Sequence, residues 1–222
     1  MADSPEITRN LLEMYGRDDW IMRTNFRIFL KRSGLMDVDR SGLVLDLGCA
    51  MGHLLRLLRQ EGFTRLAGVD ASPEMVARAR SLTGGEVVEG LAETCADHFP
   101  HGSVSAIIVS DLIHHMTTVE DWHRLLAGCH LLLKPGGVLI IREPWQTLPV
   151  RVLQHMARYP FFKIGFLKER LQSFVDEAAL LDHFFTHWPP IYRSLLQQQG
   201  FVVERDFDWL VHRITTSRKP LP

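Results

Sequence analysis

The order of apolar and polar positions predicts alternating strands and helices through the middle of the chain. Short apolar runs alternate with stretches of helical apolar spacing, and the run from Val104 to Val109 is apolar nearly throughout, as in a strand buried on both faces. This alternation favours a parallel sheet with crossover helices. We therefore expect strands over residues 43–47, 65–70, 86–89, 104–110 and 136–142, and helices over residues 52–62, 73–82 and 119–133.

The two ends of the chain follow other patterns. Before about Gly42 the apolar positions suit helices, which either pack on the sheet or fold over the carboxyl ends of its strands as a lid. Residues 144–187 are rich in aromatic and histidine residues, and we expect short helices there that form core or the wall of a substrate pocket. The last part predicts a helix over 191–199, strands over 201–206 and 210–216, and a hairpin turn at Asp208–Trp209.

Together these elements predict a single α/β domain. We expect a Rossmann-like, doubly wound sheet of seven strands, mostly parallel, with an antiparallel C-terminal edge hairpin. A chain of 222 residues is long enough to bury one large core. The expected parts are an N-terminal helical lid, a core of alternating strands and helices, an aromatic-rich helical insert, and a final helix with the hairpin, over residues 1–41, 43–143, 144–187 and 188–222.

Charge and cysteine content narrow the expected partners. The formal net charge is −1, so no overall basic field attracts nucleic acid, which we do not expect as a partner. The three cysteines show no metal spacing, and their odd number with no apparent export signal favours reduced thiols in the cytoplasm. No apolar run is long enough to span a membrane. The oligomeric state stays open.

The stretch from Val44 to His53 is the first motif with chemical content. It joins a short apolar run to a helical pattern through small residues, with glycines at 48 and 52. A dinucleotide fingerprint fails because its third glycine would fall on His53, and a phosphate loop fails because no lysine is present. The stretch resembles the acidic-x-G-x-G-x-G motif of class I S-adenosylmethionine-dependent methyltransferases, with Ala50 in place of the middle glycine. The alternative is a tight strand-to-helix turn without a ligand.

A second motif follows at the end of the next predicted strand. Asp70 lies about twenty residues beyond the glycine turn, where a carboxylate accepts hydrogen bonds from ribose hydroxyls. The alternative is a helix-capping or solvated acid. The D-x-S-x-x-M pattern is similar to the second motif of small-molecule methyltransferases, and this resemblance implies that Asp70 binds the ribose while Ala71 and Met75 line the adenine.

The segment after the third predicted strand departs from the family pattern. Many members have Gly-Asp-Ala-Glu there, and the aspartate accepts a hydrogen bond from the adenine amino group. This chain has Leu91 in place of that aspartate. A backbone contact at Leu91 or Ala92 then replaces the usual hydrogen bond, or the segment is an ordinary loop.

The acceptor side is indicated by two further segments. Ser110 to Met116 resembles the family's Ser-x-x-x-Leu-His-His segment, whose backbone passes under the cofactor and whose side chains face the acceptor. Histidine suits proton transfer near neutral pH, so His114 or His115 is a candidate general base, and packing or helix capping is the alternative. Leu133 to Trp145 resembles the family's Leu-Lys-Pro-Gly-Gly turn and fifth strand. Glu143 then orients a substrate, assists deprotonation, or pairs with an arginine.

The order and spacing of these motifs identify the chain as a member of the class I S-adenosylmethionine-dependent methyltransferases, similar to the small-molecule types 11 and 12, over roughly residues 43–143. The implied cofactor is S-adenosyl-L-methionine, and no metal site is expected. The implied catalytic residues are His114, His115 and Glu143, and the implied cofactor-binding residues are Asp46, Gly48, Cys49, Ala50, Gly52, Asp70, Ala71, Met75, Leu91, Ala92 and Ser110.

The expected reaction is methylation of a small, partly apolar metabolite on oxygen, nitrogen or carbon. The chain has no Asn/Asp-Pro-Pro-Tyr/Phe after the fourth predicted strand, which argues against methylation of nucleobase amines or glutamine amides. Two alternatives from other classes stay open. The protein binds the cofactor for a reaction other than methylation, or it is a catalytically silent partner subunit.

Overall fold

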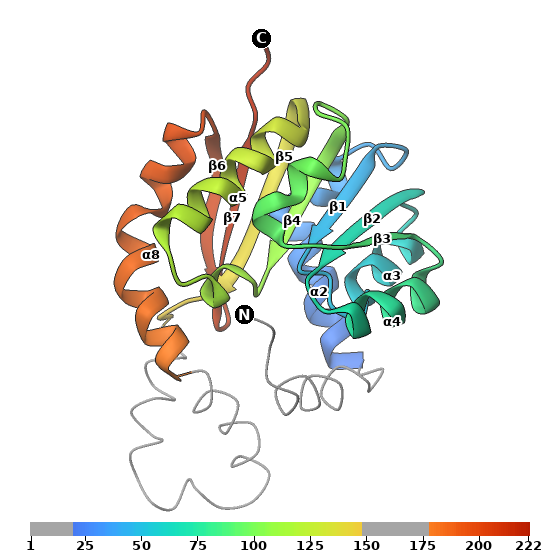
Figure 1. Ribbon diagram of the computed structural model, residues 1–222, viewed down its shortest axis with the longest axis horizontal. Coiled ribbons are helices and arrows are strands. Elements are labelled where there is room, and N and C mark those ends of the chain that lie inside the picture. Colours follow the sequence, from blue (N-terminus) through green and yellow to red (C-terminus); the bar gives the residue numbers. More distant parts are fainter. Residues whose placement is uncertain (1–19, 148–177) are drawn as a thin grey trace, which may run out of the picture.

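The computed structural model describes residues 20–147 and 178–222, and these form a seven-stranded mixed sheet covered by helices (Figure 1). The strand order is β3-β2-β1-β4-β5-β7-β6. The strands are β1 (Leu43–Leu47), β2 (Arg65–Asp70), β3 (Glu86–Glu89), β4 (Val104–Ser110), β5 (Leu133–Pro144), β6 (Val202–Trp209) and β7 (His212–Arg218).

The pairing of the strands confirms the predicted fold class. The first five strands pair in parallel, whereas β7 pairs antiparallel with both β5 and β6. The predicted bounds of the first four strands agree with the structure, and β5 begins a few residues earlier than predicted. This sheet brings the carboxyl ends of β1 to β5 to one edge, which is where open α/β sheets bind ligands.

The predicted hairpin turn at Asp208–Trp209 was wrong, because the chain reverses at Leu210–Val211. Asp208 stays in the ladder opposite Arg213, and the Arg213 guanidinium lies 2.9 Å from its carboxylate. Leu210, the first residue of this turn, has a positive φ of 54°. The chain thus reverses two residues later than predicted, and β6 continues to Trp209.

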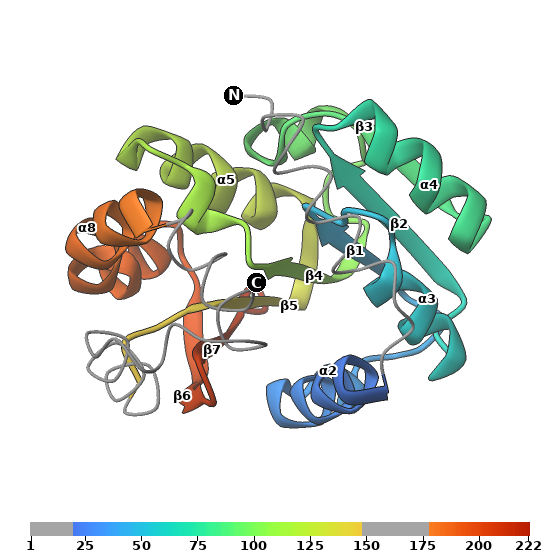
Figure 2. The ribbon, with the colours of Figure 1, turned by 90° about the horizontal axis from the view of Figure 1, so that it is seen from below.

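Two helical layers cover the sheet (Figure 2). Helices α2 (Trp20–Ser33), α3 (His53–Gln60) and α4 (Pro73–Thr83) lie on one face, and α5 (Val119–Leu132) and α8 (Ala178–Gln198) lie on the other. Short 3₁₀ helices are η1 (Leu35–Asp37), η2 (Ala92–Asp97) and η3 (Ile113–His115). Each layer has its own apolar core, so successive residues of the central strands pack on opposite sides.

The helix starts follow the sequence signals. Ser72 caps α4 by accepting from the Met75 amide, with Pro73 at the first position, and Thr118 caps α5 through the Asp121 amide. The helix predicted over 191–199 is the end of the longer α8, which continues through Pro189 and Pro190. The rest of the predicted insert, residues 148–177, lies outside the described residues.

The N-terminal region is described from Trp20 onward. In α2, Phe29 and Leu30 are buried against the sheet with Val44, Ile108 and Ile140. This part of the chain therefore packs on the sheet, while residues 1–19 of the expected lid lie outside the described residues. Among the helices described, none combines the length and the apolarity that crossing a membrane requires.

Candidate functional site

The Asp70 carboxylate is fixed at the end of β2 by two backbone amides. The Ala50 N–H donates to Oδ2 at 2.8 Å, and the Ser72 N–H donates to Oδ1 at 2.9 Å. These bonds join the end of β2 to the turn after β1, so the carboxylate is held beside the glycine turn. A carboxylate in this position has the geometry to accept from vicinal hydroxyls of a ribose.

The turn after β1 needs its glycines for two reasons. Gly48 and Gly52 have φ values of +72° and +80°, a region that favours glycine. A Cβ on Gly48 would lie 2.9 Å from the Leu112 side chain, and one on Gly52 would lie 2.9 Å from Thr83. The close approach that glycine allows here is therefore partly to the protein's own side chains. Ala50 adopts a φ of +44°, and such a conformation costs a non-glycine residue about 1 kcal/mol.

Asp46 lies at the end of β1 next to this turn and is almost completely buried, with 3% of its surface exposed. No hydrogen bond or ion pair joins its carboxyl to another described residue. Burial, together with the nearby Asp70 carboxylate, raises the pKa of Asp46 to about 8. Two acids so close together at a ligand-binding edge fit a cationic ligand, because a positive charge there would offset both the desolvation and the mutual repulsion. S-adenosylmethionine carries such charges.

Cys49 and the residues at the start of α4 complete this side of the edge. The Cys49 thiol is buried against β2, and burial with the nearby acids raises its pKa, so it is not a reactive thiol. Ala71 is exposed, whereas Met75 is buried in the helix packing. We call the ends of β1, β2 and β3 with the turns that follow them the cofactor half of the site.

The loop after β3 lies beside Asp70. The Gly90 N–H donates to the Asp70 carbonyl at 3.0 Å. Leu91 has 48% of its surface exposed, and Ala92 is buried. The Leu91 carbonyl accepts from the Thr94 N–H at 3.1 Å and from the Thr94 hydroxyl at 3.0 Å. Of the backbone contacts expected at Leu91 or Ala92, the Leu91 carbonyl is therefore already occupied.

A buried, hydrogen-bonded pair of titratable side chains lies at the ends of β4 and β5. Glu143 is 1% exposed, and its Oε1 accepts from the Leu112 and Ile113 amides, both at 2.8 Å. Its Oε2 lies 2.8 Å from Nδ1 of His114, which is also buried. Because a carboxylate only accepts hydrogen bonds, this contact assigns the imidazole proton to Nδ1 and the basic lone pair to Nε2. Within residues 20–147 and 178–222, Glu143 pairs with a histidine and with no arginine.

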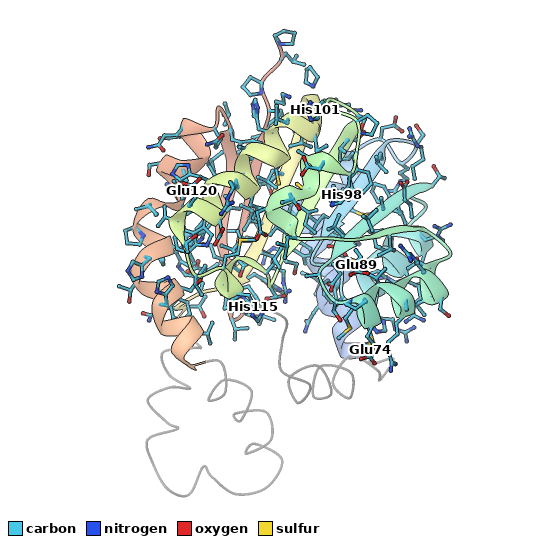
Figure 3. All side chains as sticks on the ribbon, in the orientation of Figure 1. Glu74, Glu89, His98, His101, His115 and Glu120 are labelled. Atoms are coloured by element: carbon cyan, nitrogen blue, oxygen red, sulfur yellow. The ribbon has the colours of Figure 1, made fainter. Side chains whose placement is uncertain are left out.

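Aromatic side chains surround this buried pair. The Phe184 ring of α8 meets the His114 ring edge to face, with centroids 6.2 Å apart. The His115 ring lies 4.2 Å from the His114 ring, but His115 is exposed and sits at the edge of the molecule (Figure 3). His114 and Glu143 thus form a fixed pair with an apolar wall, while His115 faces outward.

A second charged cluster lies on the other face of the same strand ends. Asp111 accepts from the Arg142 guanidinium and from Nε2 of His212 at 2.9 Å, and Nδ1 of His212 lies 3.2 Å from Arg142. Ser110 joins the cluster, because its hydroxyl accepts from Arg142 at 2.9 Å. Burial raises the pKa of Asp111, but Arg142 and His212 lower it by more, so the pKa falls below its ordinary range. Arg142 also lies over the Phe26 ring of α2.

The sequence-predicted residues therefore separate into two sets. We call the ends of β4 and β5 with the start of β7 the acceptor half of the site. It contains the predicted catalytic residues His114, His115 and Glu143, and also Ser110, which was predicted to bind the cofactor. The other predicted residues lie in the cofactor half. Sequence reasoning missed Asp111, Arg142 and His212. Charged residues at the ends of two buried strands signal the first two, but only the insertion of β7 beside β5 brings His212 to them. Among the described residues, no three side chains gather as metal ligands.

Comparison with known proteins identifies related sequences. Residues 45–141 match the model of a methyltransferase domain. A ubiquinone biosynthesis O-methyltransferase from Escherichia coli O7:K1 is 33% identical over 185 residues, which cover 76% of this chain and 74% of the relative. An uncharacterized methyltransferase from Synechocystis is 35% identical over 99 residues, which cover 44% of this chain and 45% of the relative. The chain spans 34–45% of the length of the Synechocystis protein and of two further curated relatives.

Solved structures share the fold at low sequence identity. The magnesium protoporphyrin IX methyltransferase from Synechocystis, with bound SAH, superimposes with a TM-score of 0.62 and 17% identity over 97% of this chain and all of that chain. At this identity the likeness concerns the fold alone.

Proposed function

This chain belongs to the class I S-adenosylmethionine-dependent methyltransferases, and we propose that it methylates a hydroxyl group of a small, partly apolar molecule. When bound, S-adenosylmethionine supplies an electrophilic methyl group. The residues of this chain align the acceptor with it and remove the acceptor's proton. Asp70, Asp46 and the turn after β1 are the groups that fit the cofactor.

The observation that carries the proposal is the buried pair of His114 and Glu143. A hydroxyl acceptor must lose a proton as its oxygen is methylated, so a positioned base accelerates this reaction. Glu143 orients the ring of His114 through Nδ1 and fixes the surrounding loop through the Leu112 and Ile113 amides. In this arrangement His114 accepts the proton at Nε2, and Glu143 is a positioning residue that stabilises the imidazolium.

Two further observations support a small, partly apolar acceptor. The side chain of His114 lies against the Phe184 ring, so apolar surface borders the proposed base, and Trp145, two residues beyond Glu143, is only partly buried. The relative from Escherichia coli is named as an O-methyltransferase of ubiquinone biosynthesis. A hydroxylated ring is therefore the first class of acceptor to test.

The test measures turnover of S-adenosylmethionine with a panel of phenols and quinols, together with the cofactor dissociation constant of each variant. We expect His114→Gln to lower kcat by about 10²- to 10⁴-fold, the usual contribution of a general base, and to leave cofactor affinity unchanged. His101→Gln is the control, since His101 lies at the opposite edge of the molecule (Figure 3), and His115→Gln tests the other predicted base.

Full turnover in His114→Gln would show that His114 is not the general base. If His115→Gln lost as much turnover as His114→Gln, the result would contradict the assignment of the base to His114. The rate of the wild-type protein should rise with pH as the base loses its proton, and His114→Gln should lose this part of the pH profile. A purely structural role for His114 would not change the shape of that profile.

A further inference from the structure

We propose that the segment after β3 recognises the purine of the bound nucleoside by apolar contact and does not accept a hydrogen bond from its exocyclic amino group. The inference rests on the proposed function, because it takes the nucleoside of S-adenosylmethionine as the ligand. It predicts an unusual specificity, in which the protein tolerates changes at the amino position of the purine.

The strand order determines where the purine lies. The order β3-β2-β1-β4 places Asp70, the ribose-binding group, on β2, and it places His114 beyond the end of β4. The reacting end of the ligand must reach towards His114 across β1. The base, on the other side of the ribose, then lies towards β3.

The end of β3 is held directly beside the ribose-binding acid. Glu89 is the register partner of Asp70, and the Gly90 N–H donates to the Asp70 carbonyl at 3.0 Å. Leu91 and Ala92 follow immediately, so the loop next to the expected purine begins with one half-exposed leucine and one buried alanine. Figure 3 shows Glu89 on the β2–β3 side of the molecule, apart from His115.

This loop offers apolar surface but no spare acceptor at residue 91. The Leu91 side chain cannot accept a hydrogen bond. Its carbonyl oxygen already accepts from the Thr94 N–H and the Thr94 hydroxyl, which occupy both lone pairs. A purine amino group that faced Leu91 would gain apolar contact and would keep its hydrogen bond with water. Single exposed leucines are common on protein surfaces. Leu91 is distinguished from them by its place beside Asp70.

A hydrogen-bonding site and an apolar site discriminate differently. A site built to accept a hydrogen bond strongly rejects a ligand that lacks the donor, because its buried polar group is left unpaired. An apolar surface rejects the same ligand only weakly. The two alternatives therefore predict different ratios of affinity for ligands that differ only at the amino group.

The experiment is calorimetric titration of the full chain with S-adenosylhomocysteine and with its analogue in which hydrogen replaces the purine amino group. This analogue keeps the ring nitrogen that accepts hydrogen bonds, so only the amino donor is lost. We expect the two dissociation constants of the wild-type protein to agree within about 3-fold. Leu91→Asp should bind S-adenosylhomocysteine about 10-fold more tightly than the analogue, because it restores a charged acceptor. Leu91→Ala is the matched control and should weaken both ligands equally.

A preference of the wild-type protein for S-adenosylhomocysteine above about 10-fold would overturn the inference, and Glu89→Gln and Glu93→Gln would then identify the acceptor. Binding of neither ligand would overturn both the inference and the proposed function. Equal binding of both ligands without turnover of any acceptor would support the inference and count against the proposed function alone.

Discussion

The two halves of the site are built on different physical principles. In the cofactor half, backbone amides hold the Asp70 carboxylate beside the buried Asp46, and the two acids together suit a cationic ligand. In the acceptor half, each acid is already paired with a histidine of the protein, as with Glu143 and His114. The Asp70 carboxylate of the cofactor half therefore remains available to a ligand, whereas the Glu143 carboxylate of the acceptor half orients a side chain of the protein.

The difference predicts separate effects of substitution. A change in the acceptor half should lower stability and turnover and should leave cofactor affinity unchanged. A change in the cofactor half should alter cofactor affinity and should have a smaller effect on stability.

The largest expected effect is that of Glu143→Ala on stability. The change leaves the Leu112 and Ile113 amides and the His114 imidazole without their acceptor in a buried site. We expect the free energy of unfolding, measured in urea, to fall by about 3–5 kcal/mol. Glu143→Gln keeps an acceptor and should lose only about 1–2 kcal/mol.

The control for Glu143 is Glu74→Ala on the surface of α4. Glu74 pairs with Arg78 at 3.1 Å, but both side chains are about half exposed. Its loss should change the free energy of unfolding by less than about 0.5 kcal/mol. A Glu143→Gln protein with normal stability and a weakened cofactor affinity would reverse the assignment of the two halves.

A smaller effect is expected for Asp70→Ala, and it concerns affinity. Loss of a carboxylate that accepts from ribose hydroxyls should weaken S-adenosylmethionine binding by about 10- to 100-fold. Titration calorimetry measures this change, and Asp37→Ala, an exposed acid in η1, is the control. Unchanged affinity in Asp70→Ala would show that the nucleoside does not bind at the end of β2.

The last expected effect is a pH dependence caused by Asp46. Its pKa of about 8 in the folded protein exceeds the ordinary value of 3.8, so the folded state holds a proton that the unfolded state has lost. This group's contribution to stability is fully present below pH 4 and is lost as the pH rises towards 8. Asp46→Asn mimics the protonated form and removes the loss. Between pH 6 and pH 8, the free energy of unfolding of ligand-free Asp46→Asn should rise by about 2 kcal/mol relative to that of the wild-type protein, measured by urea unfolding. If the free energies of unfolding of the two proteins changed with pH in parallel, the raised pKa of Asp46 would be contradicted.

The same contrast explains what could be predicted from the sequence. In the cofactor half, the glycine turn, Asp70 and the Ser72 cap each have a local sequence signal, although the hydrogen bond from Ala50 to Asp70 spans twenty residues. The first four strands were predicted with the observed bounds for the same reason. In the acceptor half, His114 and Glu143 were recognised separately, but their pairing was not.

The features that the sequence did not predict depend on the order of strands in the sheet and on contacts between side chains of different elements. His212 reaches Asp111 only because β7 lies between β5 and β6, and no local pattern encodes that insertion. The hairpin turn was placed too early because the ion pair of Asp208 with Arg213 joins two strands. The occupied carbonyl of Leu91 likewise depends on how Thr94 folds back on it.

The insertion of β7 also has a consequence for the order of folding. The chain is synthesised from its N-terminus, so the parallel unit from β1 to β4 can form before the last strand exists. His212 joins Asp111 and Arg142 only when that last strand enters the sheet, and contacts between such distant residues form slowly. The acceptor half is then the last part of the site to mature.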